Sequence, residues 1–244
     1  MSAPEVRYAA ATDVGLVREV NEDAHLTAPP VFVVADGMGG HAGGDVASAI
    51  VVEEFGALAG TAYDDETVVR AVAGALEACQ RRIEEHAAGG VGRAAPGTTV
   101  AGAVLVERGD PTWLVVNLGD SRVYRMHDGE LHQVSRDHSL VQELLESGEI
   151  TEDEVAEHPE RHVITRALGG PGAGEADLFR LRLDEADRLL LCTDGVSGLV
   201  DDVTIRRILA DEPDPARAAR DLVAAALEAG GEDNATAVVV DVVG

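Results

Sequence analysis

Short runs of apolar residues, each about the length of one β-strand, recur along the chain and end at turn residues. Residues 31–35 (VFVVA) form one such run, which Asp36-Gly37 closes. A β-rich apolar run of this length, bounded by turn residues, is typical of a buried strand. The same pattern predicts further strands, mostly joined by hairpins, at residues 98–106, 113–118, 122–126, 131–134, 178–183, 188–193 and 235–242.

Apolar residues at helical spacing fall between these runs. They predict helices at residues 45–59, 66–86 and 139–147, and a late helix from Asp214-Pro215 to Gly230-Gly231. Asp214 is the expected cap of that last helix, with proline in its first turn. Because few strand–helix–strand units repeat, the pattern favours an α+β layered fold over a doubly wound one. The Glu-rich stretch 148–161 is expected to be a mobile excursion that tunes substrate choice, with a helical turn at 151–156.

The charge balance narrows the range of partners. The chain carries 45 acidic and 19 basic residues, all of the latter arginine, for a formal net charge of −26. Such a surface repels nucleic-acid backbones and anionic lipid, so neither nucleic acid nor membrane is expected as a partner. A substrate that carries phosphate could bind only where local positive charge offsets the negative potential of this surface. The acidity also predicts a preference for basic residues on both sides of a substrate's phosphate.

The sequence predicts a cytoplasmic protein. It has no apolar run of about 18 residues that could span a membrane, and its first eight residues lack the charged and apolar blocks of a signal peptide. Cys79 and Cys192 are too few for a disulfide framework and are expected to be buried thiols.

Four acidic residues share one context, the end of an apolar strand beside a small or turn residue. They are Asp36, Asp120, Asp194 and Asp233. Each alone would be an ordinary turn residue. If the four converge, two carboxylates about 4 Å apart repel by roughly 4 kcal/mol at an effective dielectric of 20, so the cluster requires divalent cations. A donor set of oxygen atoms suits Mg²⁺ or Mn²⁺, and a pair of such ions could deprotonate a water for attack at phosphorus.

Other catalytic arrangements find little support. Lysine is absent and no Gly-Lys-Ser/Thr sequence occurs, which excludes a P-loop. Ser48, Ser121 and Ser197 are not in a Gly-x-Ser-x-Gly elbow, so none is expected to be a nucleophile. Taken alone, each of the eight histidines is more often a structural residue than a catalyst.

An ordered set of motifs runs through nearly the whole chain. It comprises TDVGLVREVNEDAH (12–25), VVADGMGGHAGGDVAS (33–48), GTTV (97–100), NLGDSRVYR (117–125), DHSL (137–140), ITRALGG (164–170), LLLCTDGVSG (189–198) and GGEDNATAVVV (230–240). In this order the set resembles the bacterial form of the metal-dependent protein serine/threonine phosphatases, the PPM or type 2C family. The resemblance implies one catalytic domain over residues 1–244, folded as a four-layer α-β-β-α sandwich of two mainly antiparallel sheets.

The resemblance also implies the activity and the cofactor. The expected reaction is hydrolysis of phosphoserine and phosphothreonine in proteins that serine/threonine kinases have phosphorylated. Two Mn²⁺ or Mg²⁺ ions are expected, with a third possible in bacterial members. Water activated by the ions would attack phosphorus directly, without a phosphoenzyme. A monomer is expected.

Residue roles follow the motifs by resemblance. Asp36 matches the carboxylate that bridges two metals, the Gly37 carbonyl matches a ligand of one ion, and Asp194 and Asp233 match ligands of the other. Asp120 matches the position that holds the third ion together with Asp194. The remaining candidates match residues around the metals or the substrate: Glu22, Asp23 and His25 near the metals, Arg18 as the phosphate clamp, and His41 or His158 as the general acid, with His162 the weaker choice.

Two rival functions remain open at this point. One is a module that binds phosphoproteins at the same site but does not hydrolyse them. The other is a metallophosphodiesterase, which would prefer a bis-ester to a monoester.

Overall fold

The structure is a computed structural model that describes residues 4–39, 43–88, 95–155, 158–170 and 175–243. It contains two five-stranded sheets, and all pairings between named strands in the described residues are antiparallel. Sheet 1 has the order β1 (Glu5–Asp13), β12 (Ala235–Val243), β11 (Arg188–Cys192), β8 (Arg122–His127), β9 (Glu130–Gln133). Sheet 2 has the order β10 (Asp177–Arg182), β7 (Thr112–Leu118), β6 (Val100–Val106), β3 (Val31–Ala35), β2 (Ala24–Ala28). A short ribbon pairs β4 (Gly37–Met38) with β5 (Gly97–Thr98).

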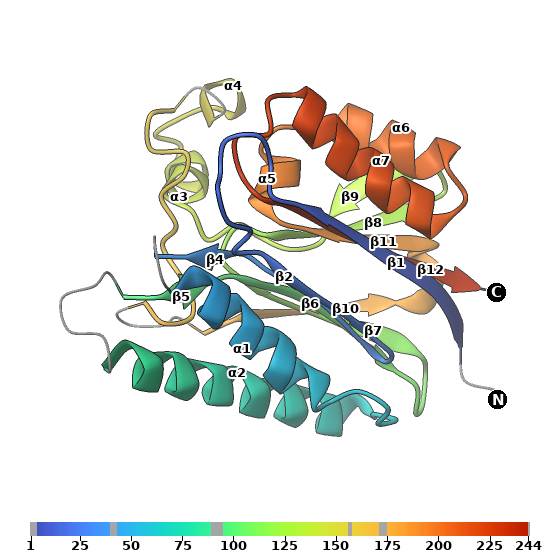
Figure 1. The fold of residues 1–244 in the computed structure, drawn as a ribbon. Coiled ribbons are helices and arrows are strands. Elements are labelled where there is room, and N and C mark those ends of the chain that lie inside the picture. Colours follow the sequence, from blue (N-terminus) through green and yellow to red (C-terminus); the bar gives the residue numbers. More distant parts are fainter. Residues whose placement is uncertain (1–3, 40–42, 89–94, 156–157, 171–174, 244) are drawn as a thin grey trace.

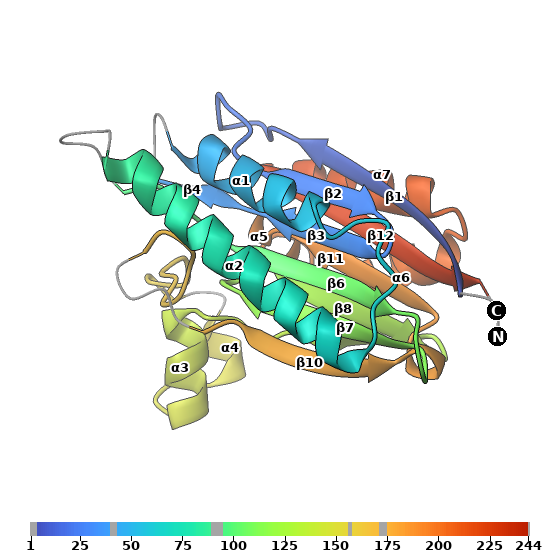
Figure 2. The ribbon, with the colours of Figure 1, turned by 90° about the horizontal axis from the view of Figure 1, so that it is seen from below.

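Helices cover the outer face of each sheet (Figure 1). The long helices α1 (Gly44–Gly56) and α2 (Asp65–Ala88) lie across sheet 2 (Figure 2). On the other side α6 (Asp202–Asp211) and α7 (Pro215–Glu228) pack on sheet 1. The shorter elements are α3 (Leu140–Ser147), α4 (Glu152–Val155), α5 (Asp194–Ser197) and the 3-10 helix Leu183–Glu185. The predicted α+β fold, with two mainly antiparallel sheets between helices, is confirmed.

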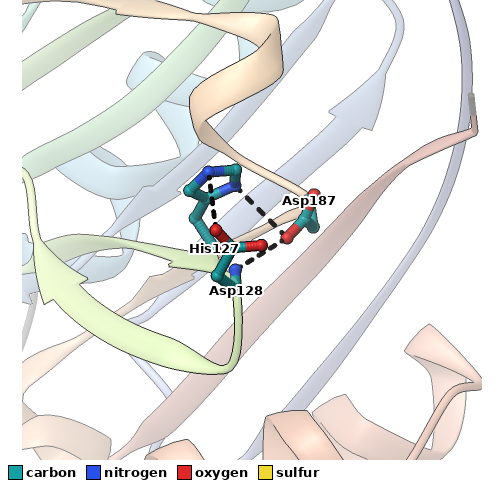
Figure 3. Close-up of side chains that lie close together, drawn as sticks. All are labelled: His127, Asp128 and Asp187. Atoms are coloured by element: carbon teal, nitrogen blue, oxygen red, sulfur yellow. Dashed lines mark hydrogen bonds and ion pairs between the residues drawn. The ribbon is translucent and has the colours of Figure 1, made fainter.

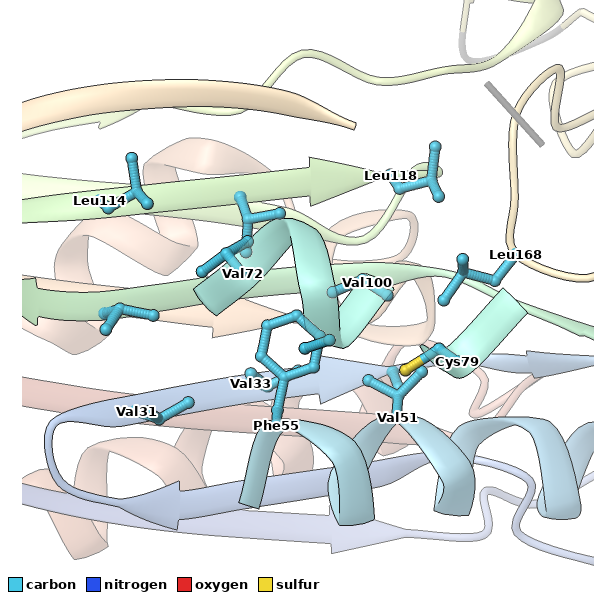
Figure 4. Packing of buried hydrophobic residues seen from close by; sticks show 14 of the residues in the cluster. Val31, Val33, Val51, Phe55, Val72, Cys79, Val100, Leu114, Leu118 and Leu168 are labelled. Carbon is cyan, nitrogen blue, oxygen red and sulfur yellow. The ribbon is translucent and has the colours of Figure 1, made fainter. Parts of the chain in front are cut away.

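Three apolar clusters hold these layers together in the described part of the chain. One lies between sheet 2 and helices α1 and α2, where Phe55 and Cys79 meet valines of β3 and β6 (Figure 4). A second lies between sheet 1 and helices α6 and α7. The third lies between the sheets and includes Phe32 and Trp113, whose rings meet edge to face. With few aromatic residues, the clusters consist mainly of Val, Leu, Ile and Ala, as expected. No helix in the described residues is long and apolar enough to cross a membrane.

The structure corrects several local predictions. Strands β1 and β2 and helix α6 were not predicted. The expected strand at 98–106 is interrupted at Thr99, so that β5 pairs with β4 and only β6 belongs to sheet 2. Asp214 does stand at the N-cap of α7, but its side chain makes no capping hydrogen bond. The predicted helical turn in the polar stretch is present as α4.

Candidate active site

Five aspartates gather where strands of the two sheets end, at the end of the molecule occupied by β4 and α5 (Figure 1). Asp36 follows β3 and Asp120 follows the end of β7 in sheet 2, while Asp23 precedes β2. Asp194 follows β11 and Asp233 precedes β12 in sheet 1. We call these five residues the aspartate cluster. Their charges act on one another across the two sheets, so the four strand-end aspartates singled out in the sequence do converge.

The carboxyl groups of Asp36 and Asp194 lie within hydrogen-bonding reach of each other. Burial raises the pKa of Asp36 well above its usual value, and the negative charges of Asp194, Asp23 and Asp120 raise it further. Burial also raises the pKa of Asp194, and a hydrogen bond from the protonated Asp36 carboxyl opposes that rise. Two carboxyl groups this close share a proton unless a cation takes its place.

Asp23 is held between strands β11 and β12. Its Oδ2 accepts hydrogen bonds from the Thr193 hydroxyl at 2.8 Å and the Thr236 hydroxyl at 2.7 Å. Burial raises the pKa of Asp23 to about 7, although these two hydrogen bonds lower it. The two hydrogen bonds to Oδ2 therefore fix the orientation of the Asp23 carboxyl group.

Three oxygen atoms of the cluster are buried and have no hydrogen-bond partner among the described residues: Asp23 Oδ1, Asp120 Oδ1 and Asp194 Oδ1. An unpaired buried carboxylate oxygen is costly, and a hard divalent cation is the ligand that removes this cost. The donor set therefore fits Mn²⁺ or Mg²⁺. Asp233 differs, because its Oδ1 accepts from the Asn234 N–H at 2.8 Å and its Oδ2 accepts from Arg18 at 2.7 Å.

The loops that carry Asp36 and Asp120 are tied together by two hydroxyl groups. The Asp36 N–H donates to Thr99 Oγ1 at 3.0 Å, and the Thr99 N–H donates to the Asp36 carbonyl at 2.9 Å. Thr99 Oγ1 also lies 2.7 Å from the hydroxyl of Ser121, the residue after Asp120. Thr99 interrupts the predicted strand at residues 98–106, and its contacts position the loops of Asp36 and Asp120.

A buried histidine fixes the Asp120 loop from the other side. The Gly119 N–H donates to His138 Nδ1 at 3.2 Å, and the His138 N–H donates to the Gly119 carbonyl at 2.9 Å. The opposite ring nitrogen lies 3.2 Å from Asp177 Oδ2. The His138 carbonyl accepts from the Thr165 N–H at 2.8 Å, which joins this loop to the segment after α4.

Gly37 and Glu22 meet at the start of helix α1. A Cβ on Gly37 would lie 2.2 Å from the Gly44 carbonyl oxygen and 2.5 Å from the Glu22 carbonyl oxygen, so only glycine permits this approach. The Ser48 hydroxyl donates to the Glu22 carbonyl at 2.5 Å. These contacts place both predicted residues beside Asp36.

Arg18 reaches the cluster from the loop between β1 and β2. Its side chain is 53% exposed and forms an ion pair with Asp233 at 2.7 Å. Asn234 anchors the loop, because its Nδ2 donates to the carbonyls of Val14 and Val20 at 2.9 and 3.0 Å and its Oδ1 accepts from the Glu22 N–H. A guanidinium held at the mouth of an acidic site is suited to bind a phosphate there.

The predicted histidines differ in their relation to the cluster. His25 lies in β2, half-buried, and burial lowers its pKa. His158 follows α4, where its Nδ1 accepts from the Glu160 N–H. His162 is near enough to Asp194 to contribute, behind burial and Asp36, to the pKa of that carboxyl group. His41 falls outside the described residues.

A second group of candidate ligands lies at the opposite end of strand β8 (Figure 3). His127, Asp128 and Asp187 are the one group in the described residues whose ligand atoms all lie within 4.8 Å of one another. His127 Nδ1 is 3.4 Å from Asp187, and Nε2 is 3.6 Å from Asp128. Since the two ring nitrogens face different carboxylates, they do not converge on one point, and the group is a set of polar contacts at the β8–β9 turn.

Sequence reasoning missed the residues that orient the aspartates. Thr193, Thr236, Asn234 and Thr99 lie inside the quoted motifs. The available signal was that Thr193 adjoins Asp194 and that Asn234 and Thr236 follow Asp233 closely, whereas Thr99 is 63 residues from Asp36 and gave no such signal. His138 lies in DHSL, but its partners Gly119 and Asp177 are distant in sequence.

Comparison with known proteins gives a consistent result. The family model described as protein phosphatase 2C matches residues 17–238. The serine/threonine protein phosphatase PstP of Mycobacterium tuberculosis is 40% identical over 248 residues, which cover 98% of this chain and 45% of PstP. The chain thus spans about half the length of that relative. The serine/threonine phosphatase stp of Listeria monocytogenes is 35% identical, and the match covers 94% of this chain and 93% of stp.

Solved structures agree with the sequence matches. The crystal structure of the Mycobacterium tuberculosis phosphatase PstP/Ppp superposes with a TM-score of 0.89 at 37% identity, covering 97% of this chain and 98% of that one. The catalytic domain of PstP in complex with two manganese ions gives a TM-score of 0.86 at 36% identity, with each chain fully covered. The family matches, the four-layer fold and the converging aspartates lead to one conclusion: the chain belongs to the protein phosphatase 2C family.

Proposed function

We propose that this chain hydrolyses phosphoserine and phosphothreonine in proteins, as a single catalytic domain over residues 1–244 that uses Mn²⁺ or Mg²⁺. One observation carries the proposal. Three buried carboxylate oxygens without partners, on Asp23, Asp120 and Asp194, lie in a cluster beside the exposed guanidinium of Arg18. This pairing of a cation site with a phosphate clamp is what hydrolysis of an anionic ester requires.

Two cations would be held by residues of the cluster together with Gly37. Asp36 would contact both, the Gly37 carbonyl would bind one, and Asp194 and Asp233 would bind the other. Asp120 with Asp194 is the candidate holder of a third.

When bound, the cations would lower the pKa of a water so that it could serve as the nucleophile on phosphorus, which would require no phosphoenzyme. Arg18 leaves Asp233 and binds two oxygens of the phosphate, where its fixed charge offsets the negative charge that builds up. Glu22, Asp23 and His25 orient the groups around the cations. A histidine protonates the leaving alkoxide, and the candidates are His41, His158 and His162.

The relatives support the cofactor and the substrate class. One solved PstP structure contains two manganese ions, and the curated relatives are named serine/threonine phosphatases. The cognate substrates of this chain are proposed to be phosphoproteins made by serine/threonine kinases. The monomeric state and the cytoplasmic location stay predictions.

Hydrolysis of p-nitrophenyl phosphate and of a phosphothreonine peptide tests the proposal. Both rates are expected to depend on Mn²⁺ and to vanish with a chelator. A bis-ester such as bis-p-nitrophenyl phosphate is expected to react more slowly. Full activity in chelator would contradict the proposal, and phosphopeptide binding without release of phosphate would favour a binding module instead.

A further inference from the structure

The loop that carries Arg18 exposes apolar side chains beside it. We define the Arg18 loop as residues 14–23, between β1 and β2. Leu16, Val17 and Val20 are 69%, 66% and 59% exposed, which places them among the most exposed large apolar residues in the described chain. Single exposed apolar residues need no explanation, but three within five positions around one arginine form a patch.

The patch is rigidly held although its side chains face water. The Leu16 N–H donates to the Gly231 carbonyl at 2.7 Å, and a Cβ on Gly231 would lie 2.9 Å from Leu16 Cγ. Asn234 accepts or donates hydrogen bonds on both sides of the loop. A partner that covers these side chains would therefore not have to order the backbone first, which favours binding.

The neighbourhood of the patch indicates the chemistry of its partner. Arg18 lies between Val17 and Val20 in sequence and pairs with Asp233 of the cluster. Val17 and Val20 are exposed close to Arg18 in the same loop, so residues that flank a phosphoresidue bound at Arg18 would pass near the patch. Glu19 and Glu232 add exposed carboxylates there, and the whole chain is strongly acidic. The apolar patch and the surrounding negative charge favour binding of a substrate segment with apolar and basic residues, and disfavour an acidic segment.

We propose that Val17 and Val20 contact the residues that flank the phosphoresidue of the substrate and select segments with an apolar side chain next to it. This inference rests on the proposed function, because it uses the same phosphate site. It adds a specificity surface that the metal site and Arg18 do not supply.

A matched pair of basic phosphothreonine peptides tests the inference. The two peptides differ only by Leu or Ser beside the phosphothreonine. The wild type is expected to show about 10-fold higher kcat/KM for the Leu peptide, the range that one apolar contact supplies. The double variant Val17→Ser/Val20→Ser should lose this preference. Val203→Ser is the control, because Val203 is also 69% exposed but lies on α6.

Equilibrium binding of the two peptides to the Mn²⁺-loaded protein, with the phosphothreonine replaced by a non-hydrolysable phosphonate, separates this inference from the proposed function. Absence of phosphate release would count against the function alone. Equal affinity of the wild type for the two peptides would overturn the inference. It would also be overturned if the double variant lost kcat/KM equally for both peptides and for p-nitrophenyl phosphate. A wild-type dimer in light scattering that this variant abolishes would assign the patch to a second copy and overturn it too.

Discussion

Asp36 is a single residue that lowers the free energy of unfolding when no cation is bound. Its carboxyl group lies against that of Asp194, and the pKa values of both are raised by burial. The arrangement is unfavourable without a cation, because like charges in a site of low dielectric repel. We infer that these residues are kept for binding and chemistry.

Asp36→Asn is expected to have opposite effects on activity and on stability. Loss of the carboxylate that the proposed function assigns to both cations should lower Mn²⁺-dependent hydrolysis by at least about 100-fold, since metal-ion catalysis contributes several kcal/mol. In chelator at pH 8 the same variant should melt at a higher temperature than the wild type, because one repelling charge is gone. Rates and thermal unfolding measure the two effects.

Asp110→Asn is the matched control for this change. Asp110 is exposed in the β6–β7 connection, so the same loss of charge there should alter neither property by more than a small amount. Unchanged activity in Asp36→Asn, or a lower melting temperature in chelator, would contradict the expectation.

Strands with a buried apolar run or a clear alternation were predictable from the sequence, including the edge strands β9 and β10, whereas the edge strands β1 and β2 were not. Strand β3 has five fully buried apolar residues, and α2 buries a regular stripe. Strand β1 has no buried residue, and β2 is only half-buried, so neither shows the apolar run or strict alternation used for prediction. Helix α6 is short and mixes three buried apolar residues with charged ones.

The same contrast holds at the site. Asp36, Asp120, Asp194 and Asp233 were found because each adjoins a recognisable strand. The groups that orient Asp23 are 170 and 213 residues away from it in sequence, so pairing between distant strands decides these contacts. Such contacts depend on sheet order, which local sequence pattern does not reveal.

At the scale of elements, His138 joins the β7–β8 connection to the segment after α4. Burial lowers the pKa of His138 from 6.5, so the folded protein binds its proton less readily than the unfolded chain. The stability from this group is fully present above pH 6.5 and is lost as the pH falls below it. His138→Gln should therefore be less stable at pH 7.5 and show a smaller loss between pH 7.5 and 5.5.

Urea unfolding at the two pH values measures this difference, and His132→Gln provides the control. His132 is exposed on β9 and should leave the pH dependence of the wild type intact. An identical pH dependence in His138→Gln and the wild type would contradict the assigned role.

At the scale of the whole molecule, cation binding and pH are coupled through the aspartate cluster. The pKa of Asp23 is about 7 in the folded protein, against an ordinary value of 3.8. A raised carboxyl pKa means that the folded state keeps its proton longer, so the contribution to stability is full below pH 4 and is lost as the pH rises through 7. With a chelator, this group should thus destabilise the protein at pH 8 relative to pH 5.

Thermal unfolding at pH 5 and 8 checks this prediction. Subtracting the same measurement on Asp23→Asn removes the effects of other titrating groups. Mn²⁺ should reverse the trend, because cations bind the deprotonated carboxylates and stabilise only the folded state. A wild type that gains more stability than Asp23→Asn from pH 5 to 8 in chelator would contradict it.

Because the cluster takes Asp36 and Asp120 from sheet 2 and Asp194 and Asp233 from sheet 1, its geometry spans the seam between the two halves of the sandwich. The spacing of the proposed cation ligands therefore depends on the thickness of the apolar layer between the sheets, where Phe32 and Trp113 pack. Under the proposed function, the affinity for the cations would change if that thickness changed. A substitution in the packing between the sheets would thus be expected to lower activity even though it replaces none of the proposed ligands.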